Sequence, residues 1–328
     1  MIDLGQEFVY VRNEAELPDD THLVSRKTDL VLPSGPFRVA LDYRGHKHAL
    51  FPLESGQVEV ADATAAVRLQ TRELEVDGGL TRFADLECTD SQLELVFEHL
   101  VADVVERVVS DPTSPGRSCL EAMHEWRDLM RTAGDAVSRE VALGLAGELE
   151  ALRLLGVQDP AAALGSWTGP ERSTHDFSAS GRRLEVKTTS SVDGQFVRVS
   201  NLDQLDPSTA AGGLHLLVVH CAPDDSAPSL DDRIRALVYA GFSRTALIKA
   251  VAKWGYVFES GQRAQRFIVR SLRLWSVDDH FPGLRASDIP TGRRAAISRV
   301  TYELSLAAAP NPMEVTEMEE VLATWCHS

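Results

Sequence analysis

Hydrophobic and polar positions alternate along the first ninety residues in the manner of half-buried strands. The stretch "PFRVALDYRGHKHALFPL" predicts a hairpin that turns at Arg44 and Gly45, and "AAVRLQTRELEV" predicts a further strand followed by a turn at Gly78 and Gly79. We therefore expect the chain to open with a mainly β segment.

A helical repeat replaces this alternation after Asp90, which is a suitable N-cap. Apolar side chains then recur every three or four positions, at Leu93, Val96, Phe97, Leu100, Val101, Val104, Val105 and Val108. The stretch "DPTSPGR" at 111–117 ends the repeat, because proline and glycine interrupt helices. We predict a domain boundary there, with a β-rich domain ending in a helix over 1–112 and a second domain over 113–328.

The second domain begins with two predicted helices, "LEAMHEWRDLM" and, after an interruption by "AGD" at 133–135, "SREVALGLAGELEALRLLG" at 138–156. The latter begins at the N-cap Ser138 and ends at Gly156. Strand-like stretches follow at 175–189, in "QFVRVS" and in "LHLLVVH". Two helical segments at about 230–253 and the late strands "RFIVRSLRLWSV" and "RVTYELSL" complete the chain. The order helix, three strands, helix, strand predicts a mixed α/β fold.

Glu148 lies within the apolar stripe of the helix at 138–156. At about 100° per residue it shares a face with Leu145 and Leu152, whereas Glu150 and Arg153 lie on the other side. A buried carboxylate is costly unless it is paired, protonated or bound to a cation. Its partner is either an ordinary ion pair or N–H donor, or a functional cation.

The stretch "HDFSASGRRLEVKTT" at 175–189 combines an Asp, a tight polar turn and a charged strand. Because side chains alternate across a strand, Glu185, Lys187 and Thr189 share one face, and Leu184 and Val186 share the other. A Glu-x-Lys pair alone is also typical of an exposed salt bridge.

Taken together, Glu148, Asp176, Glu185 and Lys187 supply three carboxylates and one amine that could converge on one metal ion. Hard oxygen ligands suit Mg²⁺ or Mn²⁺, which bind through a few carboxylates together with substrate phosphate. Such a site would suit phosphodiester hydrolysis, in which the ion polarises the phosphate and activates water while the lysine offsets developing charge.

The stretches "GLAGELEALRLL", "SWTGPERSTHDF" and "RRLEVKTT" resemble the helix Glu, the Asp and the E-x-K of the PD-(D/E)XK nuclease superfamily. The resemblance implies a restriction-endonuclease-like α-β-β-β-α-β core with a β-rich N-terminal domain. The chain is most similar to a bacterial branch linked to restriction and phage-defence gene clusters, and the similarity extends to "RFADLECTDSQLELVFEHLVADVV" and "DDHFPGLRASDIPTGRRAAISRVTYEL".

The resemblance also implies roles for individual residues. Asp176 and Glu185 would be metal ligands, Lys187 the catalytic amine, Glu148 an accessory ligand or water-positioning group, and the Val186 carbonyl a further ligand. The sequence departs from the superfamily's name at His175, which stands where the name has Pro. The implied cofactor is Mg²⁺ or Mn²⁺, and the implied substrate is DNA.

Composition and charge limit the remaining possibilities. The 328 residues are 44% apolar and 25% charged, which is typical of a globular protein. The formal net charge of −16 argues against a nucleic-acid partner, yet residues 233–300 carry +9 and predict a surface for phosphate backbones. The cysteines Cys88, Cys119, Cys221 and Cys326 lack zinc or disulfide spacing, and no apolar run is long enough for a bilayer. We expect a cytoplasmic protein without a membrane partner.

Our leading hypothesis is a Mg²⁺-dependent DNA endonuclease of a restriction or anti-phage system. The rival hypothesis is a non-catalytic nuclease-fold scaffold that binds DNA or a partner, and an RNA-directed nuclease stays open as a third reading. Cutting both strands with one site per chain favours a homodimer. A defence-system NTPase or methyltransferase partner also stays open.

Other candidate groups carry less weight. His46 and His48 alternate near the hairpin turn without a carboxylate nearby in the sequence, so we expect exposed hairpin residues, and His215 and His220 are expected on opposite faces of one strand. Trp254 and Tyr256 are either core residues or base-stacking residues. Gln195, Asn201 and Gln204 either form turns or order the site and reach DNA. The sequence has no phosphate-binding P-loop, dinucleotide fingerprint or nucleophile elbow.

Overall fold

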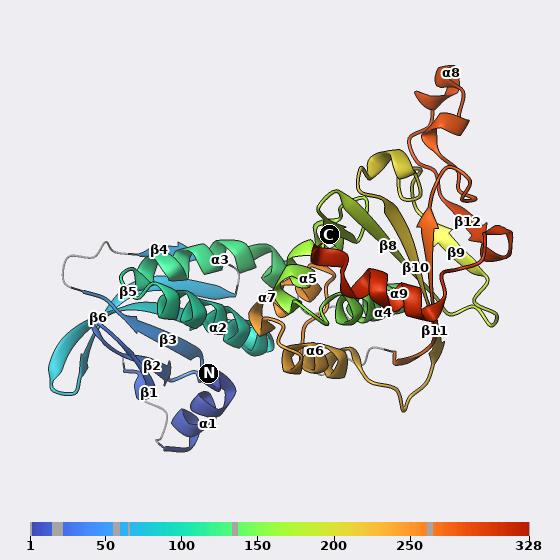
Figure 1. Cartoon of the computed structure of the whole chain (residues 1–328). Coiled ribbons are helices and arrows are strands. Elements are labelled where there is room, and N and C mark those ends of the chain that lie inside the picture. The colour runs from blue at the N-terminus through green and yellow to red at the C-terminus, as the bar shows by residue number, and fades with distance from the viewer. Residues whose placement is uncertain are drawn as a thin grey trace. The chain divides into compact units, whose positions relative to one another are not determined.

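The computed structural model describes residues 2–14, 22–54, 60–64, 66–132, 137–260 and 265–327. The chain divides into two compact units, residues 1–135 and 136–328 (Figure 1). The boundary that we predict between residues 112 and 113 falls between two helices, α2 (Glu94–Ser110) and α3 (Pro115–Thr132), that both belong to the first unit. The predicted "AGD" interruption at 133–135 lies outside the described residues.

The first unit contains an antiparallel sheet of six strands in the order β1-β2-β3-β6-β5-β4. The strands are β1 (Val24–Leu32), β2 (Gly35–Leu41), β3 (Lys47–Pro52), β4 (Ala61–Ala63), β5 (Val67–Val76) and β6 (Gly79–Cys88). All residues of β3 are buried, because this strand lies between β2 and β6 in the middle of the sheet.

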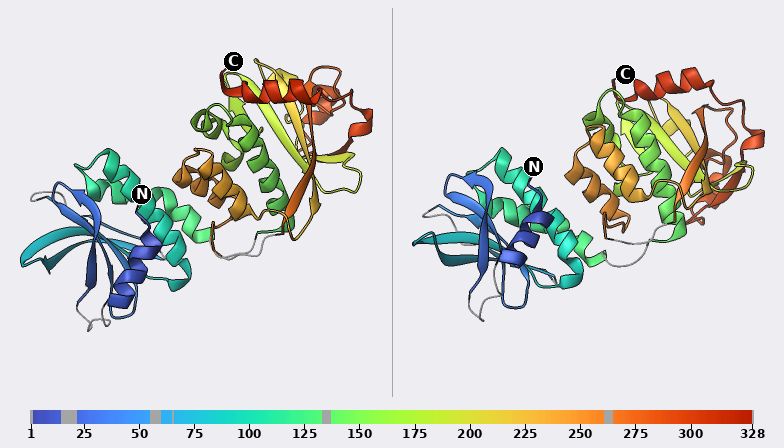
Figure 2. Two further views of the ribbon diagram at one scale, coloured as in Figure 1. Left: turned by 60° about the horizontal axis from the view of Figure 1, so that its bottom comes forward. Right: turned by 90° about the horizontal axis from the view of Figure 1, so that it is seen from below.

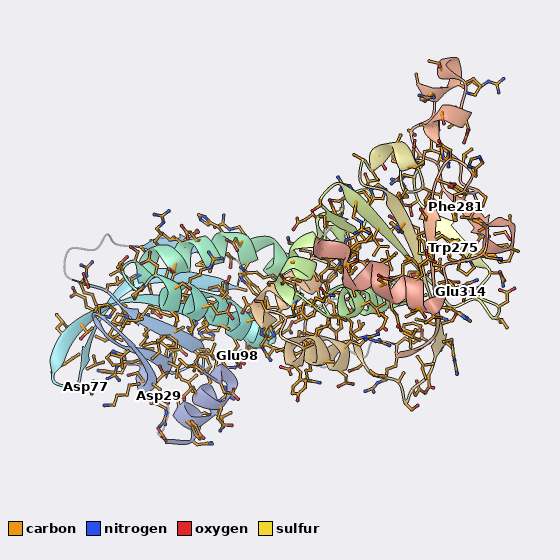
Figure 3. All side chains as sticks on the ribbon, viewed as in Figure 1. Asp29, Asp77, Glu98, Trp275, Phe281 and Glu314 are labelled. Carbon is orange, nitrogen blue, oxygen red and sulfur yellow. The ribbon has the colours of Figure 1, made fainter. Side chains whose placement is uncertain are left out.

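Three helices accompany this sheet, namely α1 (Leu4–Glu14), α2 (Glu94–Ser110) and α3 (Pro115–Thr132). Asp90 accepts a hydrogen bond from the backbone N–H of Gln92 and so caps the short turn that leads into α2, as predicted. The Trp126 indole of α3 donates to Asp103 of α2 over 3.0 Å, which fixes the two helices to each other. The Lys47 ammonium reaches Glu94 and Glu98 of α2, so this side chain of β3 points toward the helices (Figure 3 labels Glu98).

The two predicted hairpins of the first unit are present, with one difference. β2 and β3 pair around a turn in which Gly45 has a φ of 82°, as the sequence predicts. β5 and β6 turn instead at Asp77 and Gly78, which have φ angles of 52° and 81°, and Gly79 already pairs with Val76. An Asp-Gly pair suits a turn in which both residues have positive φ.

The expectation that His46 and His48 are exposed hairpin residues is wrong. The His48 side chain is 1% exposed and the His46 side chain 21% exposed. Side chains alternate along β3, so His48 points to the sheet face opposite that of Lys47. Its neighbours there include Glu87 of β6, which pairs directly with His48 although it lies 39 residues further along the chain.

The second unit contains a four-stranded sheet in the order β11-β10-β8-β7 and a separate two-stranded ribbon, β12-β9. Its strands are β7 (Phe177–Ala179), β8 (Arg182–Thr189), β9 (Phe196–Val199), β10 (Leu214–Pro223), β11 (Phe267–Val277) and β12 (Tyr302–Ser305). Its helices are α4 (Arg139–Leu155), α5 (Pro160–Ser166), α6 (Leu230–Tyr239), α7 (Arg244–Lys253), α8 (Thr291–Arg294) and α9 (Val315–Ala323). The segments α4, β7, β8, β10, α6–α7 and β11 give the predicted α-β-β-β-α-β order.

The three strands of this order are not the three that the sequence predicts. The stretch at 175–189 supplies two of them, β7 and β8, as an antiparallel hairpin. "QFVRVS" forms β9, which leaves the main sheet and pairs with β12 about a hundred residues later. The predicted helix over 138–156 is confirmed, since Ser138 caps its first turn and Gly156 follows its last residue.

The four-stranded sheet separates two differently built layers (Figure 2). Helices α4 and α6 lie on one side of it, and the β9–β12 ribbon lies on the other. Val197, Val199, Leu216 and Leu304 are buried together on the ribbon side. Trp275 and Phe281 belong to the same core and lie close together, with ring centroids 6.4 Å apart (Figure 3). Since Leu216 pairs with Glu185, the charged face of β8 faces the ribbon.

Within the described ranges, none of the helices combines the length and the apolar character that crossing a membrane requires.

Candidate metal-dependent active site

The candidate site forms where the hairpin of β7 and β8 opens. The two strands turn at Ser180 and Gly181, whose φ angles are 47° and 82°, so the predicted tight polar turn is present. β7 pairs with β8 only from Arg182 to Leu184. β10 pairs with the other edge of β8 as far as Thr189. The β7-side edge of β8 is therefore left without a strand partner from residue 185 onward, within the part of the chain that the structure describes.

Asp176 lies at the start of this opening, and both its backbone carbonyl and its carboxylate accept hydrogen bonds. Its backbone carbonyl accepts hydrogen bonds from the N–H groups of Thr168 and Gly169, at 2.8 and 2.9 Å. Its carboxylate Oδ2 accepts the Val186 N–H of β8 at 2.7 Å. The N–H and C=O of one strand residue point to the same edge, so the Val186 carbonyl faces this opening as well.

Glu185 and Lys187 lie side by side on one face of β8, as the alternation predicts. Lys187 Nζ is 2.6 Å from Glu185 Oε1 and donates to Gln204 Oε1 at 3.0 Å. The Glu185 side chain is 1% exposed, and its second oxygen, Oε2, has no hydrogen-bond partner among the described residues. A buried carboxylate oxygen without a donor is the kind of atom that a cation stabilises.

Glu148 reaches the same place from α4. It is buried, and its Oε2 accepts the indole N–H of Trp167 at 2.7 Å. Gly169 lies between this carboxylate and Asp176, because a Cβ atom at position 169 would be 2.5 Å from Glu148 Oε2 and 3.4 Å from Asp176 Oδ1. Only a residue without a side chain leaves both carboxylates undisturbed there.

The four predicted residues therefore meet in one electrostatic cluster. Burial, and after it the charge of Asp176, raise the pKa of Glu185 to about 8 against the opposing effect of Lys187. Burial also raises the pKa of Asp176 to about 6, and that of Glu148 well above its ordinary value. Three carboxylates share one ammonium, so ionising all of them leaves excess negative charge in a buried place.

These residues suit a divalent cation by charge and ligand type. Carboxylate and carbonyl oxygens are hard ligands, and a bound cation would offset the repulsion among the carboxylates. The carboxylate oxygens of Glu148, Asp176 and Glu185 do not all lie within 4.8 Å of one another. In the described part of the chain, the group of three that meets this spacing is Asp42, His48 and Glu87 in the first unit.

Gln204 is a site residue to which the sequence gives no definite role. Its side-chain oxygen accepts both the Lys187 ammonium and the backbone N–H of Ser200, at 3.0 and 2.8 Å. Asn201 supports the same loop by accepting the backbone N–H groups of Asp203 and Gln204. The Gln195 carbonyl accepts the backbone N–H of Leu306, next to the β9–β12 ribbon. Gln204 thus orders the site directly, and Asn201 does so through its loop.

Trp167 is the residue that sequence reasoning missed. It lies within the quoted "SWTGPERSTHDF", but nothing in the local pattern pairs it with a helix residue 19 positions earlier. Its backbone forms an isolated bridge with Phe177, and the two rings stack with centroids 6.3 Å apart. This packing aims the indole N–H at Glu148.

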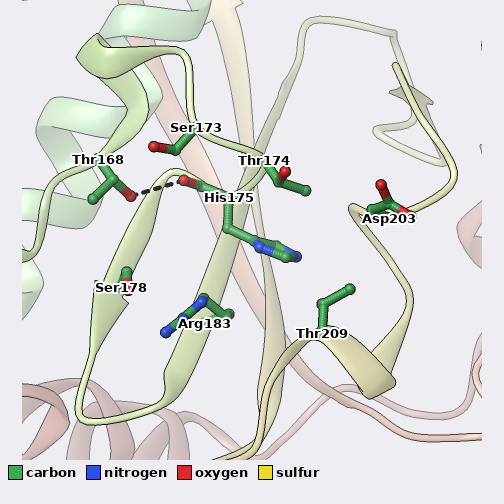
Figure 4. Close-up of a pocket in the computed structure, with 8 residues that line it drawn as sticks. All are labelled: Thr168, Ser173, Thr174, His175, Ser178, Arg183, Asp203 and Thr209. Atoms are coloured by element: carbon green, nitrogen blue, oxygen red, sulfur yellow. Dashed lines mark hydrogen bonds between the residues drawn. The ribbon is translucent and has the colours of Figure 1, made fainter.

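A polar cavity of about 490 Å³ adjoins the site (Figure 4). Its lining is shown in the figure: Thr168, Ser173, Thr174, His175, Ser178, Arg183, Asp203 and Thr209. The cavity adjoins the site at Thr168, which lines the cavity and whose backbone N–H donates to the Asp176 carbonyl at 2.8 Å. Burial lowers the pKa of His175. His175, which stands where the superfamily's name has Pro, therefore contributes an imidazole to the cavity wall.

The aromatic and histidine candidates contact other residues of the second unit. Tyr256 is buried, and its hydroxyl donates to Asp231 at 2.6 Å, so the core interpretation is confirmed for this residue. His215 packs edge-on against Trp325, whereas a ring nitrogen of His220 lies 3.0 Å from the Ser191 carbonyl.

Neighbouring carboxylates pair with part of the basic segment over 233–300. Six of its members form ion pairs, namely Arg233, Arg235, Arg244, Lys253, Arg266 and Arg285. Arg263 lies outside the described residues. Arg293, Arg294 and Arg299 are exposed in and after α8. Two of them, Arg294 and Arg299, help to line a hollow of about 340 Å³ together with the 200–203 loop, next to Gln204.

Comparison with known proteins identifies a family for the chain. No curated protein and no solved structure matches the chain significantly. A family model described as "Putative PD-(D/E)XK family member, (DUF4420)" matches residues 16–307, a span that includes all four predicted site residues and most of the first unit. Because this match covers far more than half of the sequence, the chain belongs to the DUF4420 family, a nuclease-like branch of the PD-(D/E)XK proteins.

Proposed function

We propose that the second unit is a metal-dependent endonuclease that hydrolyses phosphodiester bonds of DNA. The observation that carries the proposal is the meeting of Asp176, Glu185 and Lys187 at the open edge of β8. A nuclease-like family assignment and an under-compensated carboxylate cluster both support it.

The metal, Mg²⁺ or Mn²⁺, would be held by Asp176, Glu185 and the Val186 carbonyl, with Glu148 as an accessory ligand. When bound, such an ion polarises the scissile phosphate and lowers the pKa of a coordinated water. Asp176 is already oriented by the Val186 N–H, and Glu148 by the Trp167 indole. Both carboxylates can therefore accept a ligand with little rearrangement of the chain.

Lys187 has a separate role. Glu185 and Gln204 hold its ammonium in place. A fixed positive charge stabilises the negative charge that develops on the phosphate, and an ammonium can also orient the attacking water. The exposed Arg293, Arg294 and Arg299 would bind the phosphate backbone beside the site.

The proposal extends to biological context through the resemblance to proteins of restriction and phage-defence gene clusters. It includes a homodimer for double-strand cleavage, and an NTPase or methyltransferase partner as a regulator. The rival function is a non-catalytic scaffold, favoured by one observation: the three carboxylates are spread more widely than 4.8 Å.

The experiment is a cleavage assay on supercoiled plasmid, phage genomic DNA and single-stranded RNA, with Mg²⁺, Mn²⁺ or EDTA. We expect metal-dependent nicking or linearisation of DNA. Lys187→Ala should lower the rate by about 10²- to 10³-fold, the usual loss when one fixed charge-stabilising donor is removed. Asp176→Asn, which removes a charged metal ligand, should abolish cleavage.

Lys27→Ala is the matched control, because Lys27 is an exposed lysine of the first unit. It should cleave like the unmodified protein. DNA binding without cleavage in every metal would favour the scaffold, and cleavage of RNA alone would reassign the substrate. Cleavage that survives both substitutions would remove the proposed site.

A further inference from the structure

A second candidate metal site lies in the first unit, on residues that the proposed nuclease does not use. β3 and β6 are neighbouring strands of the six-stranded sheet (Figure 1). His48 lies on β3, Glu87 on β6, and Asp42 in the turn before β3. Each of the three offers one side-chain ligand atom, and these three atoms lie within 4.8 Å of one another. His48 and Glu87 are buried, and the Asp42 side chain is 14% exposed.

His48 presents one ring nitrogen that nothing else uses. Its Nδ1 lies 2.8 Å from Asp85 Oδ1, and the His48 and Asp85 side chains are 1% and 0% exposed. Its Nε2 is buried and has no hydrogen-bond partner among the described residues. With the proton on Nδ1, donated to Asp85, Nε2 carries a lone pair. Metal-binding histidines are held in this way, by a carboxylate on the ring nitrogen remote from the metal.

The two carboxylates are also oriented through one oxygen each. Asp42 Oδ1 accepts the backbone N–H groups of Arg44 and His46, both at 2.8 Å. Glu87 Oε2 accepts a hydrogen bond from Arg68 at 3.1 Å. The other oxygens, Asp42 Oδ2 and Glu87 Oε1, lie 3.0 and 3.8 Å from His46 Nδ1. These two oxygens therefore point toward a common place, beside a second imidazole.

We propose that Asp42, His48 and Glu87 bind one divalent transition-metal ion of the Zn²⁺ class, with His46 as a fourth ligand. An imidazole ligand favours Zn²⁺ and its first-row neighbours over Mg²⁺ or Ca²⁺, which prefer oxygen alone. Two carboxylates balance the charge of the ion. Asp42, His48 and Glu87 supply three ligands, and the His46 imidazole beside the two carboxylates is placed to complete a four-coordinate shell, as in a structural zinc site.

The consequence for the fold is a cross-link without a disulfide. The ion would join the turn of the β2–β3 hairpin to β6, whose residues come about forty positions later. An ion that binds the folded state but not the unfolded state stabilises the folded state. We therefore assign the ion a structural role in the sheet of the first unit, independent of phosphodiester hydrolysis.

The test is a Zn²⁺ titration of the full chain by calorimetry, with Asp176→Asn and Glu185→Gln introduced to disable the proposed nuclease site. We expect one Zn²⁺ per chain and a higher Tm when the ion is bound. Asp85→Asn replaces the carboxylate that orients His48 and also contacts Arg72, and it should weaken binding by about 10- to 100-fold. Glu87→Gln and Asp42→Asn should weaken it further. Co²⁺ should bind in place of Zn²⁺ with the absorption spectrum of a four-coordinate site.

Glu73→Gln is the matched control, because Glu73 is an exposed carboxylate of the same sheet. It should bind Zn²⁺ like the parent protein. Cooperative thermal unfolding of each variant without metal establishes that the chain is folded. Absence of bound Zn²⁺ and Co²⁺ from the folded parent would overturn the proposal, as would binding that Glu87→Gln and Asp42→Asn leave unchanged. Either result leaves the proposed nuclease function untouched.

Discussion

The two units bury carboxylates to a similar depth but compensate them differently. In the first unit, Asp85 contacts both His48 and Arg72. Burial alone would raise the pKa of Asp85, but the hydrogen bonds and charges of His48 and Arg72 outweigh it and hold this pKa below its usual range. In the second unit, Glu148, Asp176 and Glu185 share Lys187, and their pKa values rise. At a similar depth of burial, the hydrogen-bond donors and charges around a carboxylate therefore decide the direction in which its pKa shifts.

This contrast separates two kinds of metal site. The carboxylates of the second unit lack positive charge, so a hard divalent cation would supply what the chain does not. The cluster of the first unit has arginines at its border, and its unsatisfied atom is an imidazole nitrogen. One site is expected to exchange its ion easily, and the other to hold it as part of the fold.

The largest effect on the second unit should come from Gly169→Ala. The new Cβ would lie 2.5 Å from Glu148 Oε2 and 3.3 Å from Trp167 Nε1, so the Glu148–Trp167 hydrogen bond must shift. We expect a loss of about 1–3 kcal/mol in the free energy of unfolding, as for other overpacked sites, and a loss of cleavage. Denaturant unfolding and the plasmid assay measure the two.

Gly165→Ala is the matched control for this substitution, because nothing lies within 4 Å of a Cβ at position 165. Its stability and cleavage should stay at the level of the parent. If Gly169→Ala behaves like Gly165→Ala, Glu148 has no fixed place in the site, and the contrast between the two units weakens.

An intermediate effect should appear in the pH dependence of Mn²⁺ binding to the second unit. Asp176 and Glu185, with pKa values of about 6 and about 8, must lose protons before they can bind a cation. Affinity should therefore rise with pH between about 6 and 8, by up to about tenfold per pH unit for each proton released. Calorimetry in two buffers of different ionisation enthalpy counts those protons.

The titration uses a chain with Asp42→Asn and Glu87→Gln, so that the first unit contributes no binding. Adding Glu185→Gln should flatten the upper part of the pH curve, because that proton no longer has to leave. A pH-independent affinity in the parent would mean that these carboxylates are not the ligands.

The smallest effect should be on DNA affinity, when exposed arginines are replaced in one unit at a time. Replacing Arg293, Arg294 and Arg299 together with Ala should reduce the slope of log affinity against log salt by about 2.7, if each arginine neutralises one phosphate. Fluorescence anisotropy at several salt concentrations measures this slope. The matched triple substitution of Arg12, Lys27 and Arg44, exposed residues of the first unit, should leave the slope unchanged. The reverse result would assign DNA binding to the first unit.

Local sequence signals predict much of this fold. Ser138 and Gly156 bound α4, Asp90 caps the turn before α2, and the alternation in β8 places Glu185 and Lys187 on one face. Each of these features depends on neighbours within a few residues, so the pattern of one segment contains the information.

Features that depend on distant pairing could not be predicted in this way. β9 pairs with β12 rather than with the main sheet, and no local pattern specifies that partner. The same holds for the metal cluster of the first unit. Asp42 lies only six positions before His48, but Glu87 lies 39 positions after it, and the register of β3 against β6 places Glu87 opposite His48. The family resemblance brings Glu148, Asp176, Glu185 and Lys187 into one prediction, but it does not extend to Trp167 or Gln204.

The contact between Asp176 and the Val186 N–H decides which substitution tests the site cleanly. Val186 is 7% exposed, so its amide has little access to water, and the Asp176 carboxylate is its acceptor. A buried N–H that loses its acceptor costs about 1–3 kcal/mol of folding free energy. Asp176→Ala would leave the amide in that state, whereas Asp176→Asn keeps an acceptor oxygen. The asparagine is therefore the substitution expected to remove the charged ligand while preserving the fold.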